Sequence, residues 1–469
     1  MIPEAGPRLH NATAHYERAA RRAQATGRVP ALSVTLHRAD RDPWACTVGD
    51  SGDPEHPLDA DTRFRIGSIT KTFTAVLVMQ ARDEGLLDLD QPVSAYLKVP
   101  AHGDATVRGL LSHTAGFQRE PHGDVWDTLT PPDSAGVLAQ LDRAERVLPN
   151  GRRFHYSNLG FAVLGQLVAT VRGGSWAEVL ADRILEPLRL TATTAQAPAN
   201  AAVGYLVDAY SDAARPEPRF DLGGVSPAAQ LWSTAGDMAT WASFLAAPET
   251  IDPDGAVLAA ATVDEMRWPR TTTDEALWTG GFGLGLILAP QDNRVLHVGH
   301  DGAMPGFLAG AYGRRGGDDT PGALGCAVLG SSGTASQIND LVHELLKLAA
   351  ELDPPEIKPW AMAAPVPAEY RSALGPWWSE GSPFVFAWHD DALQARAADA
   401  PADRPPAVFR PVPDRPDVLR TVSGREAGEL LRLTRDARGT IARMHWATYR
   451  FTRGQEAFDG VPPSAGAEE

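Results

Sequence analysis

The sequence predicts a mixed α/β (α+β) chain in two parts, a large domain over residues 1–353 and a small antiparallel β-domain over residues 368–456. In the first part, segments with apolar residues at helical spacing alternate with short β-rich runs. Five prolines between Pro354 and Pro367 then mark a linker over residues 354–367. Beyond the linker, short strand-like runs follow one another, which is typical of a β-sheet or barrel. The tail, residues 457–469, is expected to be disordered.

The length and composition of the chain limit its number of domains and the kinds of partner that it can bind. The chain has 469 residues, enough for about two or three domains. Its 43 basic and 59 acidic residues give a net charge of −16, which disfavours nucleic acid and anionic membrane surfaces as partners. No apolar leader segment begins the chain and no stretch reaches the roughly 18 apolar residues of a membrane span, so we expect a cytoplasmic protein. Cys46 and Cys326 are expected to be free thiols, and no histidine spacing suggests a metal, so no metal or other cofactor is expected.

The elements of the first half follow from apolar spacing and turn residues. We expect an amphipathic helix, two strands joined by a polar turn, a buried helix, and then short helices. In order, these segments are residues 12–27, 31–37, 44–48, 69–85, 92–97 and 107–116.

The second half is assigned in the same way. Residues 154–160 form a polar elbow before a helix, residues 231–238 lead into another helix, and residues 281–285 are expected to be a glycine-rich strand because their spacing does not match a nucleotide loop. The glycines of residues 295–313 are typical of a strand that lines a cleft. The remaining helices are expected at residues 161–171 and 336–352, the helix after the loop at 231–238 falls within residues 227–245, and the remaining strands are expected at residues 324–329, 384–388, 419–422, 429–433 and 444–451.

The first chemical motif is Ser68-x-x-Lys71, at the start of the buried helix. Residues three apart share a helix face, so the Lys71 amine can lie beside the Ser68 hydroxyl. A serine hydroxyl needs a base, and an amine acts as one only if desolvation lowers its pKa toward neutrality. Alone, the pattern is weak and favours a capping serine near a snorkelling lysine.

Two further motifs lie downstream. Tyr156-x-Asn158 precedes a helix, where its phenol and amide point to one side of an extended backbone, although a packing ring and a helix cap would give the same pattern. His300-Asp301-Gly302 lies in the glycine-rich stretch. His113 is interpreted as structural, since nothing near it in the sequence suggests a catalytic partner.

In this order, the three motifs resemble the serine β-lactamase and penicillin-binding-protein superfamily, in particular the class C β-lactamase, D-aminopeptidase and esterase branch. The resemblance covers roughly residues 10–350. It implies a five-stranded antiparallel sheet flanked by helices, with an all-helical insert between the first and third motifs. The C-terminal β-domain is then expected to be a lipocalin-like sheet or barrel.

The resemblance implies catalytic roles for five residues. Ser68 would be the acylated nucleophile. Lys71 and Tyr156 would share the role of base, and Asn158 would orient Lys71 and the substrate amide. His300 stands where many relatives have lysine, and would steer a substrate carboxylate or tune Tyr156.

The same resemblance implies how the substrate is held. The amides of Ser68 and Ala303 would form the oxyanion hole, worth about 3 kcal/mol per donor in other enzymes. Asp301 and Gly302 would lie against the substrate. Asp301 replaces the hydroxyl residue of the usual third motif, which weakens attraction to an anionic β-lactam, so an efficient β-lactamase is disfavoured.

Three functions share this chemistry. The layout resembles free-standing penicillin-binding-protein-type thioesterases, which macrocyclise a nonribosomal peptide through a D-configured residue; this interpretation is slightly favoured. In it, Trp232 would line the acyl pocket and Arg453, or next Arg450, would face the site. The alternative is a D-stereospecific peptidase or esterase that uses water, and a minor one is a non-catalytic peptide or β-lactam receptor. The expected partner is a small peptide or peptidyl (thio)ester substrate, with a carrier protein for the thioesterase.

Overall fold

The protein is described by a computed structural model that covers residues 7–274, 276–292, 294–316, 322–335, 337–355, 359–362, 364–379, 381–401 and 404–456, with only the backbone of residues 7–11. The chain divides into two compact units, Met1–Glu356 and Ile357–Glu469. Their boundary lies inside the predicted linker. The predicted disordered tail lies outside the described residues.

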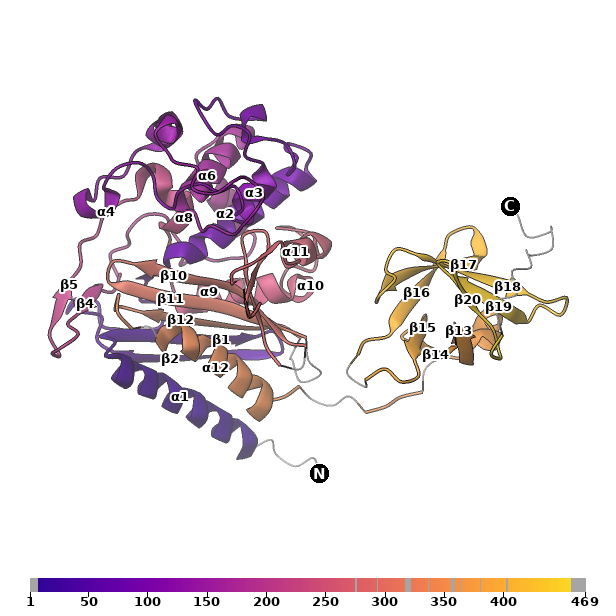
Figure 1. The fold of residues 1–469 in the computed structure, drawn as a ribbon. Coiled ribbons are helices and arrows are strands. Elements are labelled where there is room, and N and C mark those ends of the chain that lie inside the picture. Colours follow the sequence, from indigo (N-terminus) through magenta and orange to yellow (C-terminus); the bar gives the residue numbers. More distant parts are fainter. Residues whose placement is uncertain are drawn as a thin grey trace. The chain divides into compact units, whose positions relative to one another are not determined.

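The large unit is built on one antiparallel sheet with the strand order β2-β1-β12-β11-β10-β9-β8-β7 (Figure 1). The expectation of five strands is therefore corrected to eight, because three short strands extend the β10 edge. These strands are β1 (Ala31–Arg38), β2 (Arg41–Gly49), β7 (Thr271–Thr272), β8 (Gly281–Phe282), β9 (Ile287–Pro290), β10 (Leu296–Met304), β11 (Phe307–Arg315) and β12 (Leu324–Gly330).

Helices cover both faces of this sheet. On one face, α1 (Pro7–Gly27) and α12 (Gln337–Leu352) pack together against an apolar core (Figure 1). On the other face, α9 (Ala235–Ala246) packs across β1, β11 and β12. There it shares the largest core with α2 (Thr70–Asp83), which is buried from Thr70 to Ala81. The predicted buried helix is thus the centre of the large unit.

The segment between the first and third motifs is mainly helical, as expected, but it is not all-helical. The strands β4 (Tyr205–Val207) and β5 (Ala214–Pro216) pair there, and β6 (Trp232–Ser233) pairs with β3 (Phe64–Arg65). The α-helices are α3 (Val107–Leu111), α4 (Val125–Thr128), α5 (Ser134–Ala139), α6 (Asn158–Arg172), α7 (Trp176–Leu180), α8 (Ser226–Ala229), α10 (Pro248–Ile251) and α11 (Ala260–Met266). The shorter turns are η1 (Gly67–Ile69), η2 (Val93–Ala95), η3 (Gln140–Asp142), η4 (Ala181–Leu185) and η5 (Gly223–Val225).

The predicted strand over residues 295–313 is a hairpin of two strands, β10 and β11, joined at Pro305 and Gly306. Gly306 has φ +76, a conformation that glycine adopts without strain and that turns the chain back. The glycine-rich composition therefore reflects a turn as well as close backbone packing.

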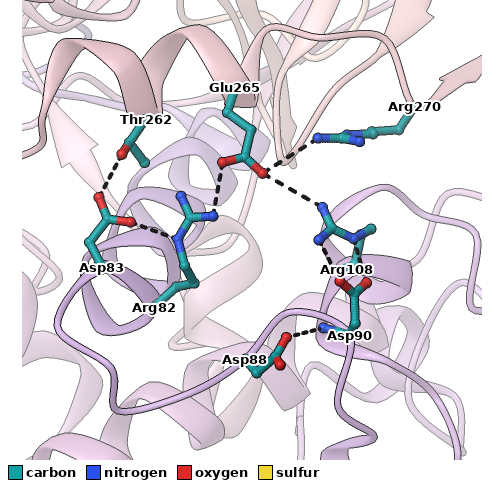
Figure 2. Close-up of polar contacts among 8 residues, drawn as sticks. All are labelled: Arg82, Asp83, Asp88, Asp90, Arg108, Thr262, Glu265 and Arg270. Carbon is teal, nitrogen blue, oxygen red and sulfur yellow. Dashed lines mark hydrogen bonds and ion pairs between the residues drawn. The ribbon is translucent and has the colours of Figure 1, made fainter. Parts of the chain in front are cut away.

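A group of charged side chains fixes the C-terminal end of α2 (Figure 2). Glu265 of α11 accepts a 2.8 Å hydrogen bond from Arg82, and also pairs with Arg108 at 3.7 Å and Arg270 at 3.5 Å. Beside it, Thr262 of α11 donates to Asp83 of α2. One carboxylate therefore compensates three guanidinium groups from three segments.

Replacement of Glu265 by alanine is expected to lower the free energy of unfolding by about 1–2 kcal/mol, because three arginines lose their shared partner. Chemical denaturation followed by circular dichroism measures the change. Glu55→Ala, at an exposed glutamate, is the control and is expected to stay within about 0.5 kcal/mol of the native chain. Equal stability of the two variants would show that the network contributes nothing.

The small unit is an up-and-down β-sheet whose eight strands pair in chain order (Figure 1). The first and last strands are joined by the pair Trp378 and Thr452, whose amides donate to each other's carbonyls at 2.8 and 3.0 Å. The sheet is therefore a nearly closed barrel, as expected. Its strands are β13 (Gly375–Ser379), β14 (Ser382–His389), β15 (Ala392–Ala397), β16 (Ala407–Val412), β17 (Arg415–Ser423), β18 (Leu430–Arg435), β19 (Ile441–Trp446) and β20 (Tyr449–Phe451), preceded by η6 (Ala368–Ala373).

Both cysteines are free thiols, as expected; Cys326 is buried and Cys46 is partly buried. None of the helices in the described residues is both long enough and apolar enough to span a bilayer.

Candidate active site

Ser68 lies in η1, the short turn between β3 and the buried helix α2. The chain enters this turn from a strand pair, and the Ile66 amide donates to the Leu231 carbonyl at 3.0 Å. The turn continues directly into α2, which begins at Thr70. Ser68 is therefore held at the edge of the core while remaining partly exposed.

The Lys71 amine contacts the Ser68 hydroxyl. Its Nζ lies 3.0 Å from Ser68 Oγ, 2.6 Å from Asn158 Oδ1 and 2.9 Å from the carbonyl oxygen of Ala228. Lys71 is fully buried, and this desolvation lowers its pKa well below 10.5.

These contacts define what a neutral Lys71 can do. Asn158 Oδ1 and the Ala228 carbonyl only accept hydrogen bonds, so they take the two N–H groups of an uncharged amine. The nitrogen lone pair is then left for the Ser68 hydroxyl. In this arrangement the amine is ready to remove the Ser68 proton.

Tyr156 precedes α6 and is held by its cap. The Ser157 hydroxyl accepts from the Gly160 amide at 3.0 Å and so caps the helix. The Ser157 amide in turn donates to Nδ1 of His113 at 3.1 Å, and the His113 ring lies 4.4 Å from the Tyr156 ring. His113 is thus structural, as interpreted, but it supports the tyrosine of the site.

The Tyr156 phenol interacts with the Ser68 side chain. Burial raises the pKa of Tyr156, against the opposing effects of this contact and of Arg119, whose guanidinium lies 4.9 Å from the ring. Tyr156 therefore holds its proton while Lys71 tends to lose its own. We infer that Lys71 takes the serine proton, and that Tyr156 passes a proton to the leaving group and regains one from the Lys71 ammonium, whose nitrogen lies 4.8 Å from the centre of its ring.

Glu120 is a site residue that sequence reasoning missed. Its Oε1 accepts from Asn158 Nδ2 at 2.6 Å, which turns the Asn158 carbonyl oxygen toward Lys71. Burial raises the Glu120 pKa, and the Asn158 hydrogen bond opposes that rise. No local pattern marks this glutamate or His113, because each meets the motifs only through folding.

His300 is buried and neutral. Its Nδ1 lies 2.5 Å from the Asp301 carbonyl oxygen, which can only accept, so this nitrogen carries the proton. Burial, with the nearby Lys71 amine, lowers the His300 pKa to about 3. An uncharged imidazole 6.0 Å from the Tyr156 ring is suited to tuning that residue and not to attracting a carboxylate. The steering role implied for His300 is therefore not supported.

The backbone around Ser68 touches β10 directly. A methyl group on Gly302 would lie 1.9 Å from the Ile66 carbonyl oxygen, and one on Gly67 would lie 2.6 Å from the Ala303 nitrogen. Gly67 also has φ +51, where a side chain is strained. This approach brings the segments carrying the Ser68 and Ala303 amides together, which an oxyanion hole requires.

Asp301 lies on the other face of β10. Side chains alternate along a strand, and the Asp301 carboxyl accepts from the Tyr312 hydroxyl beneath α12. Burial raises its pKa to about 6. Its implied contact with substrate is therefore corrected to a structural one, and the argument that this carboxylate weakens attraction to an anionic β-lactam is corrected with it.

The side chains of Trp232 and Arg453 both pack against other residues of their own unit. Trp232 is 2% exposed, with its ring 5.6 Å from that of Phe307 and beneath the Arg65 guanidinium. Arg453 donates to three carbonyls of its own unit and covers the Trp377 ring at 4.0 Å. Each side chain is therefore occupied by contacts within its own unit.

The protonation states predict a pH dependence for acylation of Ser68. The rate is expected to fall as the pH drops through the Lys71 pKa, well below 10.5, because a protonated amine cannot accept the serine proton. Between that pKa and 10.5 the unfolded chain binds more protons at Lys71, so this residue makes stability rise with pH. The second-order rate of labelling by a phosphonate probe measures the profile. A rate that rises only near pH 10.5 would contradict it.

Within the described part of the chain, no three histidine, cysteine or acidic side chains lie together in a way that could hold a metal ion. Acyl transfer through a serine needs a nucleophile, a base and donors for the oxyanion. The side chains and backbone amides around Ser68 are groups of these three kinds.

The fold brings the Ser68, Lys71 and Tyr156 side chains together in one site. Residues 17–330 match the family model described as Beta-lactamase. The chain therefore belongs to the beta-lactamase family, which consists of serine hydrolases and related proteins. Residues 366–453 match a model described as Domain of unknown function (DUF7586).

Individual relatives extend this result. Penicillin-binding protein 4 of Amycolatopsis lactamdurans is 31% identical over 345 residues, covering 69% of this chain and 86% of the relative. A D-stereospecific amidohydrolase from Streptomyces sp. superimposes with a TM-score of 0.57 at 25% identity, over 73% of this chain and 98% of that structure. SurE matches 95% of this chain and 100% of its own, with a TM-score of 0.57 at 24% identity, a likeness of fold. The chain spans about half, 51%, of Beta-lactamase-like protein 2 of Dictyostelium discoideum.

Proposed function

We propose that the protein is a serine amidohydrolase or esterase that forms an acyl-enzyme at Ser68 with a small peptide and passes the acyl group to water. One observation carries the proposal. The buried Lys71 amine donates hydrogen bonds to the Asn158 side-chain oxygen and the Ala228 carbonyl, and its third polar contact is with the Ser68 hydroxyl. A packing lysine has no need of this arrangement.

The comparisons support a D-configured residue in the acyl donor. One structural neighbour is a D-stereospecific amidohydrolase, and it aligns over almost its full length. The relative from Amycolatopsis lactamdurans is named as a penicillin-binding protein. We therefore propose peptides, amides or esters whose acyl group ends in a D-residue as the substrate class.

Water is favoured over an internal amine as acceptor. The interpretation as a macrocyclising thioesterase depended on Trp232 as a pocket wall and Arg453 as a residue facing the site. Trp232 is buried and the Arg453 guanidinium donates to Ser372, Leu374 and Pro376. Neither observation favours cyclisation or a carrier protein, so hydrolysis is the simpler proposal.

A fluorophosphonate probe tests the nucleophile. Native protein is expected to be labelled at Ser68, and Ser68→Ala is expected to lose the label. Ser226→Ala is the control, at a serine whose hydroxyl donates to the Gly223 carbonyl. Absence of labelling, or labelling that survives in Ser68→Ala, would favour the non-catalytic receptor.

Product analysis tests the acceptor and the stereochemistry. We expect a peptidyl thioester or amide that ends in a D-residue to give the linear acid. The L-residue epimer is expected to react at least about tenfold more slowly. Mass spectrometry distinguishes the acid from a ring, which lacks one water. A cyclic product would restore the thioesterase interpretation, and equal rates for the two epimers would reject D-selectivity.

A further inference from the structure

The C-terminal barrel has two different ends. Because its strands pair in chain order, the turns alternate between the ends, and the β13–β14, β15–β16, β17–β18 and β19–β20 connections share one of them (Figure 1). We call this end the mouth. The opposite end holds η6, which precedes the first strand.

The end that holds η6 is closed by side chains. Tyr370 of η6 stacks on Trp388 with ring centroids 5.3 Å apart, and Trp377 Nε1 donates to the Ala373 carbonyl at 2.6 Å. Arg453 adds hydrogen bonds to the carbonyls around the start of β13. This end of the barrel is therefore a packed plug.

The mouth contains a cavity of about 340 Å³, within the usual size range of small-molecule sites. Aromatic rings form one part of its wall, with Phe384 and Phe451 5.2 Å apart edge to face and Trp446 beside them. Beside these rings, the small side chains of Ala395, Ala397 and Ala407 line the cavity and leave its space open.

Apolar groups make up most of the cavity wall, which also includes Ser379, Ser382 and Tyr449. The indole nitrogen of Trp446 donates to Thr421 Oγ1 at 2.8 Å, so this polar group already has a partner. Phe451 is 1% exposed and Phe386 packs behind it. A ligand in this space therefore needs an apolar body.

The rim adds positive charge. Arg396, Arg404 and Arg425 line the opening against two carboxylates, Asp399 and Glu426. Arg396 Nη2 donates to the Arg404 carbonyl at 2.6 Å, which ties this rim together, and the Arg425 side chain is 82% exposed while it contacts Glu426. In a chain of net charge −16, a local excess of arginine is a distinct feature.

We propose that the mouth of the C-terminal barrel binds a small carboxylate carried on an aromatic or branched apolar body. The apolar body would enter the cavity between the rings and the alanines, and the carboxylate would remain at the arginine rim. This site is formed by residues of the small unit alone and does not rest on the proposed function.

The matched pair 4-phenylbutyrate and 4-phenylbutanol tests the proposal on the full chain by isothermal titration. The two molecules share one apolar body and differ in charge. The acid is expected to bind with a Kd of about 1 mM, as a fragment of this size allows, and the alcohol about tenfold more weakly.

Variants locate the site. The double change Arg404→Gln and Arg425→Gln is expected to weaken the acid about tenfold and leave the alcohol unchanged. Arg438→Gln, in the turn between β18 and β19 at the plugged end, is the control. Ala397→Phe fills the mouth and is expected to abolish binding of both molecules, with circular dichroism confirming that each variant is folded.

Three results would overturn the proposal. They are no saturable binding of the acid, equal affinity for the acid and the alcohol in the native chain, and unchanged affinity in the rim and cavity variants. The last result would place the binding elsewhere on the chain.

Discussion

Replacement of Lys71 by methionine is expected to slow acylation of Ser68 by about 10³-fold, the scale of a lost general base. Methionine has a similar length and suits the buried surroundings, so the helix is expected to form. The amine that accepts the serine proton is lost, and the acceptors on Asn158 and Ala228 lose their donor. Stopped labelling reactions with a fluorophosphonate probe, or ester turnover, measure the rate.

The control for this variant is Lys98→Met, at an exposed lysine. It is expected to keep the native rate. Melting temperatures of both variants separate a loss of chemistry from a loss of folded protein. A Lys71→Met enzyme within about tenfold of the native rate would contradict the assignment of Lys71 as base.

Replacement of Gly302 by alanine is expected to reduce kcat by about 10²-fold or more, although it removes no functional side chain. The added methyl group would lie 1.9 Å from the Ile66 carbonyl oxygen, so β10 or the Ser68 turn has to move. Either movement separates the Ala303 amide from Ser68, and loss of one oxyanion donor has an effect of this size.

Gly310→Ala is the matched control on the neighbouring strand. Its methyl group would meet Val342 at 3.5 Å and Asn339 at 3.6 Å, which are ordinary contacts. Steady-state kinetics with one ester substrate compare the two variants. Equal activity of Gly302→Ala and Gly310→Ala would show that the close approach of β10 to the turn is unimportant for catalysis.

The local chemistry of the site was predictable because its residues lie close together in the sequence. Ser68 and Lys71 are three residues apart on one helical turn, and Tyr156 and Asn158 flank the cap of α6. The fold class followed in the same way, since apolar periodicity marks α2, α6 and α12.

Other features escaped prediction for physical reasons. The strands β13, β15 and β16 were missed because proline or small residues dilute their apolar pattern, and pairing with neighbours defines them. The predicted strand over residues 444–451 is interrupted at Ala447, where φ is +53 and the chain turns between β19 and β20.

The sequence by itself determined the pairing of Ser68 with its neighbouring Lys71, the helix that presents them, and the division into an α/β part and a β-barrel part. These are properties of local spacing and composition. Only the tertiary structure decided that Lys71 is desolvated, that Glu120 and His113 support Asn158 and Tyr156, and that His300 and Asp301 face opposite sides of one strand. Burial and strand alternation set these features, because both depend on which distant segments pack together.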